Sequence, residues 1–220
     1  MLLRSIVLSL SPEQFTGRNS DFLFASCYVS NYVTRRIRKL RHDVEGFSTI
    51  VIEGWRERAD SAAKVVPDRA LQVPVEFSLS AYDALGVHER HEFYLEMLRI
   101  GMEKASVGFD VPLAAIMQAI VEFREGGYRN SWIHASKPIQ KGLKVLLHCD
   151  LDPKRFRLEL QLQRGADVVR EWTVVETRPD ELIFAHRFKS LLVEGPNIVV
   201  RSKFDDVEFS KPLDEILASS

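Results

Sequence analysis

Hydrophobic and polar residues alternate along much of the second half of the chain. Between residues 155 and 163, one phenylalanine and three leucines alternate with arginine, glutamate and glutamine. A period of two residues is typical of a β-strand that buries one face and exposes the other. Turn-forming residues separate six such runs, at 128–136, 143–151, 155–163, 167–177, 182–193 and 197–204. Because the connections between these runs are short, we expect them to be antiparallel neighbours.

The first half of the chain has the three-to-four-residue period of amphipathic helices. Apolar residues recur at this spacing between positions 22 and 44, after potential caps at 19–21, which predicts a long helix that Gly46 ends. Two further helices are predicted, at 88–106 and from Pro112 to a glycine pair, and they should form a hairpin against the sheet. The last of them is apolar nearly all round, which predicts that it is buried.

Shorter apolar runs predict additional strands at 2–10, 48–54 and 72–79. Pro74 has no amide hydrogen, so the third of these runs should lie at a sheet edge or begin a strand there. The polar segment 56–70 is interpreted as a surface loop or short helix. A short helix capped by Ser210 is expected over 211–218.

These elements predict one α+β domain spanning residues 1–220. Its N-terminal part (1–127) would supply strand, helix, strand and helical hairpin, and its C-terminal part (128–220) would supply a mainly antiparallel sheet of about six strands and the short final helix. The N-terminal strands would join that sheet, which would pack on the long helix and the hairpin. No internal repeat or linker divides the chain.

Charge is balanced overall but unevenly distributed. The chain has 30 basic and 31 acidic residues. Residues 1–41 carry seven basic and two acidic groups (+5), whereas residues 42–127 carry eight and fifteen (−7). The near-neutral total does not favour a nucleic-acid or membrane partner.

The two cysteines, Cys27 and Cys149, lie far apart among apolar neighbours, which fits reduced core thiols. The opening MLLRSIVLSL is expected to be a strand, because it lacks a basic leader and a cleavage pattern. No window reaches the roughly 18 apolar residues of a membrane span. We therefore expect a cytoplasmic protein without a membrane partner.

The segment HERHE resembles a metal motif only superficially. His88, Glu92 and Glu96 share one helical face and could offer nitrogen and oxygen ligands to a divalent metal. Their spacing matches neither His-Glu-x-x-His, nor its inverse, nor the Glu-x-x-His pairs of di-iron bundles. We interpret the segment as a solvent-facing helix start and expect no metal or cofactor.

A basic run at the end of the first predicted helix contains Arg35, Arg38 and Lys39, with tyrosines one to two turns earlier. Guanidinium groups beside aromatic rings could bind phosphate and stack on bases. Cations near a helix C-terminus also complement its dipole. Nucleic-acid binding through 35–41 is therefore kept as the second alternative function.

Histidines of the predicted sheet offer a possible enzyme site. His148 should lie on the polar face near Asp150, whereas His186 should lie between two core phenylalanines. A base made from His148 or His134 has no nucleophile beside it, and glycine-rich, Gly-x-Ser-x-Gly and Cys-x-x-Cys motifs are missing from the sequence. No catalytic residue is assigned, and an enzyme with a pocket between helices and sheet is the first alternative.

The leading hypothesis is a non-enzymatic protein-binding module of the adaptor, inhibitor or toxin-neutralising immunity type. Arginine and tryptophan are frequent at binding hot spots, and a rigid sheet with one polar face could present them to a protein partner. The expected contact residues lie on that face and on the basic helix end: Arg155, Arg157, Glu159, Gln161, Arg170, Trp172, Arg35, Arg38 and Lys39.

Overall fold

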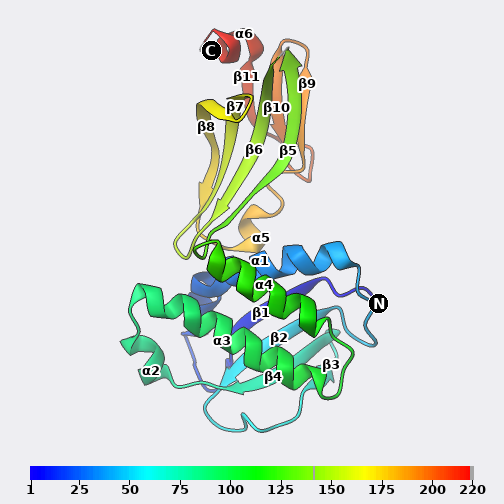
Figure 1. Ribbon diagram of the computed structural model, residues 1–220, viewed down its shortest axis with the longest axis vertical. Coiled ribbons are helices and arrows are strands. Elements are labelled where there is room, and N and C mark those ends of the chain that lie inside the picture. Colours follow the sequence, from blue (N-terminus) through cyan, green and yellow to red (C-terminus); the bar gives the residue numbers. More distant parts are fainter. Residues whose placement is uncertain (141, 219–220) are drawn as a thin grey trace. The chain divides into compact units, whose positions relative to one another are not determined.

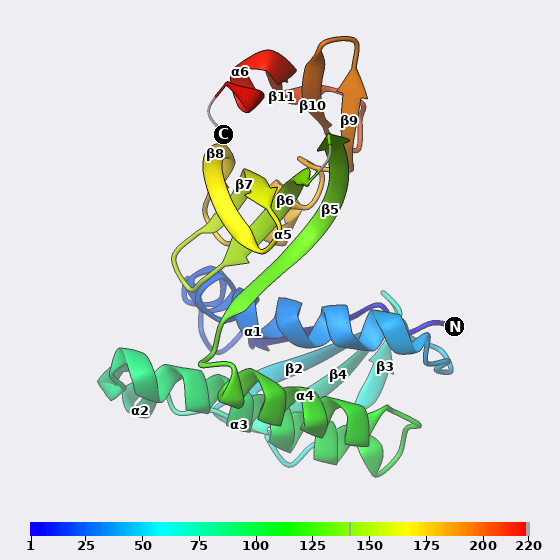
Figure 2. The same cartoon turned by 45° about the horizontal axis from the view of Figure 1, so that its top comes forward.

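The computed structural model, which describes residues 1–140 and 142–218, is a mixed α and β fold (Figures 1 and 2). The chain divides into two compact units, Met1–Asn130 and Ser131–Ser220, where the sequence led us to expect one domain. The division falls close to position 128, where the sequence changes from a helical period to a period of two. The N-terminal unit has one sheet and the C-terminal unit has two, and each unit has its own apolar core.

The N-terminal unit is built on a mixed sheet with the strand order β1-β2-β4-β3. Strands β1, β2 and β4 are parallel, and β3 is a short antiparallel edge strand. A long helix between β1 and β2 provides the crossover that parallel neighbours need. The elements of this unit are β1 (Ser5–Leu10), α1 (Asn19–Leu40), β2 (Thr49–Trp55), β3 (Lys64–Val66), β4 (Ala70–Glu76), α2 (Leu79–Ala84), α3 (Val87–Ser106) and α4 (Leu113–Glu125).

One face of this sheet forms the core of the N-terminal unit. Apolar side chains from β1, β2 and β4 lie in register on it and are almost completely buried. Helices α3 and α4 run side by side, and α3 packs on β2 and β4 (Figure 1). At the closest point an alanine Cβ in place of Gly101 would lie 2.5 Å from Cγ2 of Ile52. Glycine therefore sets the distance between α3 and the sheet.

Helix α1 closes the open edge of β1 with its side chains. The amides of Ile6, Leu8 and Leu10 donate to Thr34 Oγ1, Ser30 Oγ and Asn19 Oδ1, at 3.0, 3.3 and 2.9 Å. These bonds satisfy donors that an edge strand otherwise exposes. The predicted cap at 19–21 is wrong, because Arg18 occupies the cap position and the Asn19 side chain serves β1 instead.

Several predicted boundaries in this unit also need correction. Helix α1 ends at Leu40 with Arg41 in a left-handed conformation (φ 51°), so Gly46 does not end it. Helix α4 buries one side only, and Val121 is 41% exposed, so the prediction of a buried helix is wrong. Helix α2 and strand β3 were not predicted. Strand β3 pairs only with Ala70–Gln72, so Pro74 has no partner strand on that side, as its missing amide requires.

The C-terminal unit contains two antiparallel sheets, with the strand orders β5-β6-β7-β8 and β11-β10-β9 in the described residues. Its elements are β5 (Asn130–Gln140), β6 (Leu143–Leu151), β7 (Phe156–Arg164), β8 (Asp167–Thr177), α5 (Glu181–Phe184), β9 (Ser190–Glu194), β10 (Asn197–Arg201), β11 (Val207–Pro212) and α6 (Leu213–Leu217). The antiparallel pairing that short connections predict is confirmed. The strands form two sheets, however, and not one sheet that continues into the N-terminal strands.

Two predicted elements of the C-terminal unit are wrong in detail. The run at 182–193 begins with α5, because the Asp180 side chain accepts from the Leu182 amide and starts a helix; β9 follows only at Ser190. Ser210 lies in β11 and does not cap α6, whose cap position is Pro212. Among the described residues, no helix is both long and apolar enough to cross a membrane.

Candidate functional site

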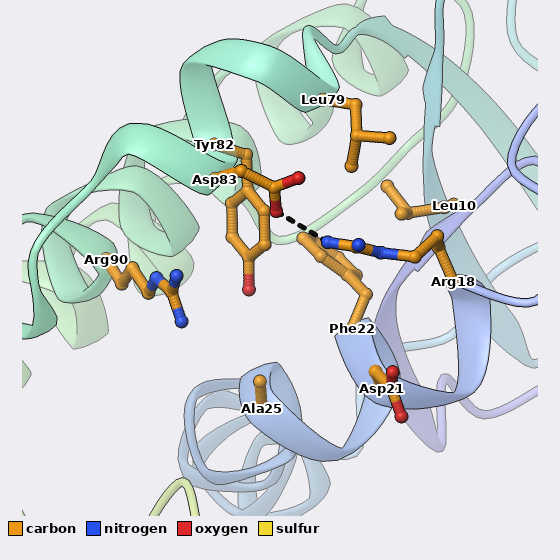
Figure 3. A pocket seen from close by; sticks show the side chains of 9 residues that line it. All are labelled: Leu10, Arg18, Asp21, Phe22, Ala25, Leu79, Tyr82, Asp83 and Arg90. Atoms are coloured by element: carbon orange, nitrogen blue, oxygen red, sulfur yellow. Dashed lines mark hydrogen bonds and ion pairs between the residues drawn. The ribbon is translucent and has the colours of Figure 1, made fainter.

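The N-terminal unit contains a cavity of about 160 Å³ beside the carboxyl end of β1 (Figure 3). Its wall comes from the end of β1, the loop after it, the first turns of α1, helix α2 and the first turn of α3. Ligands of α/β folds commonly bind at the carboxyl ends of parallel strands, where connecting segments converge. The lining residues are Leu10, Arg18, Asp21, Phe22, Ala25, Leu79, Tyr82, Asp83 and Arg90.

The inner wall of the cavity is apolar and aromatic. Phe22 is buried at the start of α1, and its ring centroid lies 5.4 Å from that of Tyr82 on α2. The Tyr82 hydroxyl lies 2.6 Å from the Tyr94 hydroxyl on α3. Burial raises the pKa of Tyr94, so this hydroxyl stays neutral. The contacts fix the Tyr82 ring as a rigid part of the wall.

An ion pair crosses one side of the cavity. Arg18 Nη2 lies 2.5 Å from Asp83 Oδ1, and Figure 3 shows the two side chains meeting there. Both side chains are nearly half exposed, at 44% and 46%, so the pair contributes at most about 1 kcal/mol to stability. Its main electrostatic effect on the cavity is that Asp83 neutralises Arg18.

In the described part of the chain, Arg90 has no such partner. Its guanidinium lies over the Tyr82 ring, with Cζ 5.0 Å from the centroid, and faces the interior of the cavity (Figure 3). The Nε atom is shielded from solvent and has no hydrogen-bond acceptor in residues 1–140 and 142–218. A shielded donor without an acceptor is costly, and a charged one more so. Arg90 is therefore a cation held in place without an anion.

The neighbours of Arg90 on α3 have partners of their own and do not line the cavity. His91 Nδ1 hydrogen-bonds the Tyr28 hydroxyl, and the His91 ring stacks on Tyr128 at 4.7 Å. Burial lowers the pKa of His91, which favours the neutral ring. Glu92 accepts two hydrogen bonds from Arg124, at 2.7 and 2.8 Å, which lower its pKa to about 2. These residues brace α3 within the N-terminal unit.

The HERHE segment does not assemble a metal site in the described part of the chain. Glu92 binds Arg124, and Glu96 binds Arg99 at 2.6 Å. No group of three or more potential ligands among histidine, cysteine, aspartate and glutamate is found within the described residues. Glu89, in the first turn of the same helix, accepts from the Gly86 amide at 2.7 Å.

The basic run at the end of α1 is largely occupied by internal contacts. Arg35 hydrogen-bonds Asn130, and Arg38 Nε donates to the Arg4 carbonyl at 2.7 Å. The neighbouring Arg36 lies 2.9 Å from Glu122, and Lys39 is exposed. These contacts connect α1 to the rest of the N-terminal unit, and nucleic-acid binding through 35–41 stays a prediction.

The polar face of β7 differs from the expected water-facing surface. The apolar side chains point inward as predicted, but Glu159 and Gln161 are only 8% exposed, so the prediction that they are solvated is wrong. Strand β7 is central in its sheet, and neighbouring side chains of β6 and β8 lie on both sides of these two residues. His148 Nδ1 lies 3.5 Å from Glu159, and Arg157 lies 3.3 Å from it.

The remaining predicted contact residues lie in the same unit but form local pairs. Arg155 and Arg157 both approach Glu176, at 3.7 and 2.8 Å. Arg170 lies over the Trp172 ring at 5.6 Å, and Lys211 lies over the same ring at 5.9 Å. Their role in partner binding stays a prediction.

Two histidines that the sequence singled out are surface residues of the C-terminal unit. His134 lies edge-on to Phe188 at 4.7 Å. The prediction that His186 is a core strand residue is wrong: it follows α5, and its ring lies 5.7 Å from that of Phe204. Phe204 and Leu182 are 73% and 88% exposed. Both residues contact His186, since the Leu182 carbonyl oxygen lies 3.1 Å from His186 Nδ1, and we call these two exposed side chains the Leu182–Phe204 patch.

The cavity residues were missed because they come from four separate segments. Arg18 follows a turn, Asp83 lies on a helix that was not predicted, and Arg90 sits in a segment that the sequence presents as charged and solvent-facing. The sequence does place Arg18 among aromatic residues at 15–22 and Asp83 among aromatic residues at 77–94. It does not show that these two segments lie side by side in the fold, so this pattern alone could not identify the cavity. Neither a family model, nor a curated protein, nor a solved structure matches the chain.

Proposed function

We propose that the protein binds a small organic anion in the cavity beside Arg90. The observation that carries this proposal is the Arg90 guanidinium, which lines the cavity and has no carboxylate partner in the described chain. A bound anion would give the terminal nitrogens of this guanidinium a charged acceptor. Hydrogen bonds to charged groups contribute about 1.5–3 kcal/mol, so such a contact would make a large part of a weak ligand's affinity.

The apolar wall supports an organic ligand over a simple inorganic ion. Leu10, Phe22 and Leu79 line the same space as Arg90. Small-molecule sites are commonly apolar cavities with a few oriented polar groups. An apolar body attached to the anionic group would remove water from these side chains.

Binding fits the lining better than catalysis does. The cavity wall has no histidine, cysteine or serine, within the described residues, that could act as a nucleophile or general base. The nearest histidine in sequence, His91, is hydrogen-bonded to Tyr28 and stacked on Tyr128. Of the acidic side chains in the wall, Asp83 is engaged in an ion pair with Arg18.

The test is titration of the full chain with benzoate, followed by calorimetry and by amide chemical shifts. We expect saturable binding, with shifts in α2 and in the first turns of α1 and α3. Arg90→Gln should weaken binding by about tenfold or more, because it removes a charged hydrogen-bond donor. Arg164→Gln is the matched control, since Arg164 is exposed at the end of β7. Equal affinity of the two variants would refute the proposal.

A protein partner is the second candidate function, and the Leu182–Phe204 patch favours it. Large apolar side chains exposed to this degree are found at interaction sites, and aromatic anchors dominate hot spots. This patch replaces the polar face of β7 as the proposed contact surface, because that face is engaged in ion pairs. The test is to purify the wild type together with a partner present in equal amount, and then to repeat the purification with Phe204→Ser. If the partner stays bound to Phe204→Ser, the patch is not its docking site. Val193→Ser, an exposed valine on β9, is the control that should retain the partner.

A further inference from the structure

We infer that the ligand is a monocarboxylate with an apolar body about the size of a single ring. The inference rests on the proposed function and narrows it to a chemical class. It comes from one juxtaposition around a cavity of about 160 Å³: an arginine without an ion-pair partner among the described residues, a neutralised arginine and an apolar wall.

The volume limits the ligand's body. An apolar protein cavity of about 150 Å³ holds one benzene molecule. The cavity beside Arg90 is of similar size, so it accommodates one ring or a branched aliphatic chain of the same bulk. Nucleotides and sugar phosphates are too large to be enclosed there.

The charges limit the ligand to a single negative charge. Arg90 contributes one uncompensated positive charge, while Asp83 lies 2.5 Å from Arg18 and cancels its charge. Asp21, in the first turn of α1, also lines the cavity and complements the positive end of that helix. A dianion would therefore meet the charge of Arg90 beside the Asp21 carboxylate and a neutral Arg18–Asp83 pair, which favours a carboxylate over a phosphate.

The geometry at Arg90 also fits a carboxylate. Guanidinium presents its donors as a planar fork that matches the two oxygens of a carboxylate. The guanidinium lies over the Tyr82 ring, with Cζ 5.0 Å from the ring centroid, and this contact favours its position in the wall. The hydrogen bond between Tyr82 and Tyr94 holds the ring itself. The ligand's carboxylate would then lie at the fork, and its apolar body would contact Phe22 and Leu79.

Three probes that share one ring test the class: benzoate, benzamide and phenyl phosphate, each titrated into the full chain above about pH 7, where the phosphate ester carries close to two charges. Benzoate should bind about tenfold more tightly than either of the others, because benzamide lacks the charge and phenyl phosphate has too much of it. If phenyl phosphate binds the wild type more tightly than benzoate, the inference is overturned while the proposed function stands. If no probe binds, the proposed function itself fails.

A substitution at the ion pair provides the sharper test. Asp83→Asn removes the carboxylate that neutralises Arg18, so two cations would face the cavity. Phenyl phosphate should gain about tenfold in affinity relative to benzoate, and Arg164→Gln should leave the ratio unchanged. Unfolding by urea checks that each variant is folded, and Arg90→Lys, which keeps the charge but loses the fork, should retain weak benzoate binding. An unchanged ratio in folded Asp83→Asn refutes the assignment of charge.

Discussion

Substituting Gly101 tests how tightly α3 packs on the N-terminal sheet. An alanine Cβ there would lie 2.5, 2.7 and 2.8 Å from three carbons of Ile52, a side chain that is completely buried. Overpacking a core costs about 1–3 kcal/mol, while replacing glycine inside a helix contributes about 1 kcal/mol of stability. The new Cβ overlaps Ile52, a branched and buried side chain with little room to move, so the overpacking cost exceeds the gain in helix propensity. We expect Gly101→Ala to destabilise the N-terminal unit by up to about 2 kcal/mol.

The sign of the effect should reverse when Ile52 is shortened. Ile52→Ala alone should cost about 2–5 kcal/mol, because it leaves a cavity in the core. In that background the methyl group added at position 101 enters space that the isoleucine side chain vacated, so Gly101→Ala should become stabilising by up to about 1 kcal/mol. Hydrogen exchange of the α3 amides measures both values within the N-terminal unit, whatever the C-terminal unit does.

The control is Gly108→Ala, where a new Cβ meets nothing within 4 Å and the position lies outside α3. Its effect should be close to zero or slightly stabilising. The packing argument is refuted if Gly101→Ala has the same effect with isoleucine and with alanine at position 52.

Three other predictions follow from contacts elsewhere in the structure. Thr34→Val should destabilise the N-terminal unit by about 1–3 kcal/mol, as measured by urea denaturation, because the buried Ile6 amide loses its acceptor at 3.0 Å; Thr16→Val, at an exposed site, is the control. Glu92 has its pKa lowered to about 2 by Arg124, so its contribution is fully present above about pH 4.5 and is lost as pH falls towards 2; this dependence should be absent from the acid unfolding curve of Glu92→Gln. Tyr82→Phe should weaken benzoate binding only a few-fold, because the ring under Arg90 is kept and only the hydrogen bond to Tyr94 is lost, and a complete loss would contradict the role given to the ring.

The spacing of apolar residues predicted correctly which side chains point inward in elements that bury one face. The alternation in residues 156–162 places the apolar side chains of β7 inward, as predicted, because each step along a strand turns a side chain to the opposite face. The same alternation could not show that Glu159 and Gln161 are covered. That depends on side chains of β6 and β8, which come from other parts of the chain.

The sequence pattern favours parallel pairing of β1 and β2, but our sequence-based prediction did not include it. A strand, a long helix and a second strand form a βαβ pattern, and its crossover favours parallel neighbours. The pattern does not show that side chains of α1 accept hydrogen bonds from the amides at the edge of β1. Ser30 and Thr34 are ordinary polar residues of an amphipathic helix until the amides of Leu8 and Ile6 lie opposite them.

Charge patterns in the sequence did not single out Arg90, the residue on which the proposed binding site depends. In sequence it belongs to a run of charged residues at a helix start, where a solvated arginine is the ordinary expectation. Its neighbours Glu92 and Glu96 follow that expectation and pair with arginines on the surface. Arg90 differs because α2 places an aromatic ring beneath it and because Asp83, a carboxylate of the same cavity wall, is bound to Arg18. The lack of an anionic partner in the described chain is thus a property of the whole wall, and a change at Asp83 or Tyr82 should alter what Arg90 binds without touching Arg90 itself.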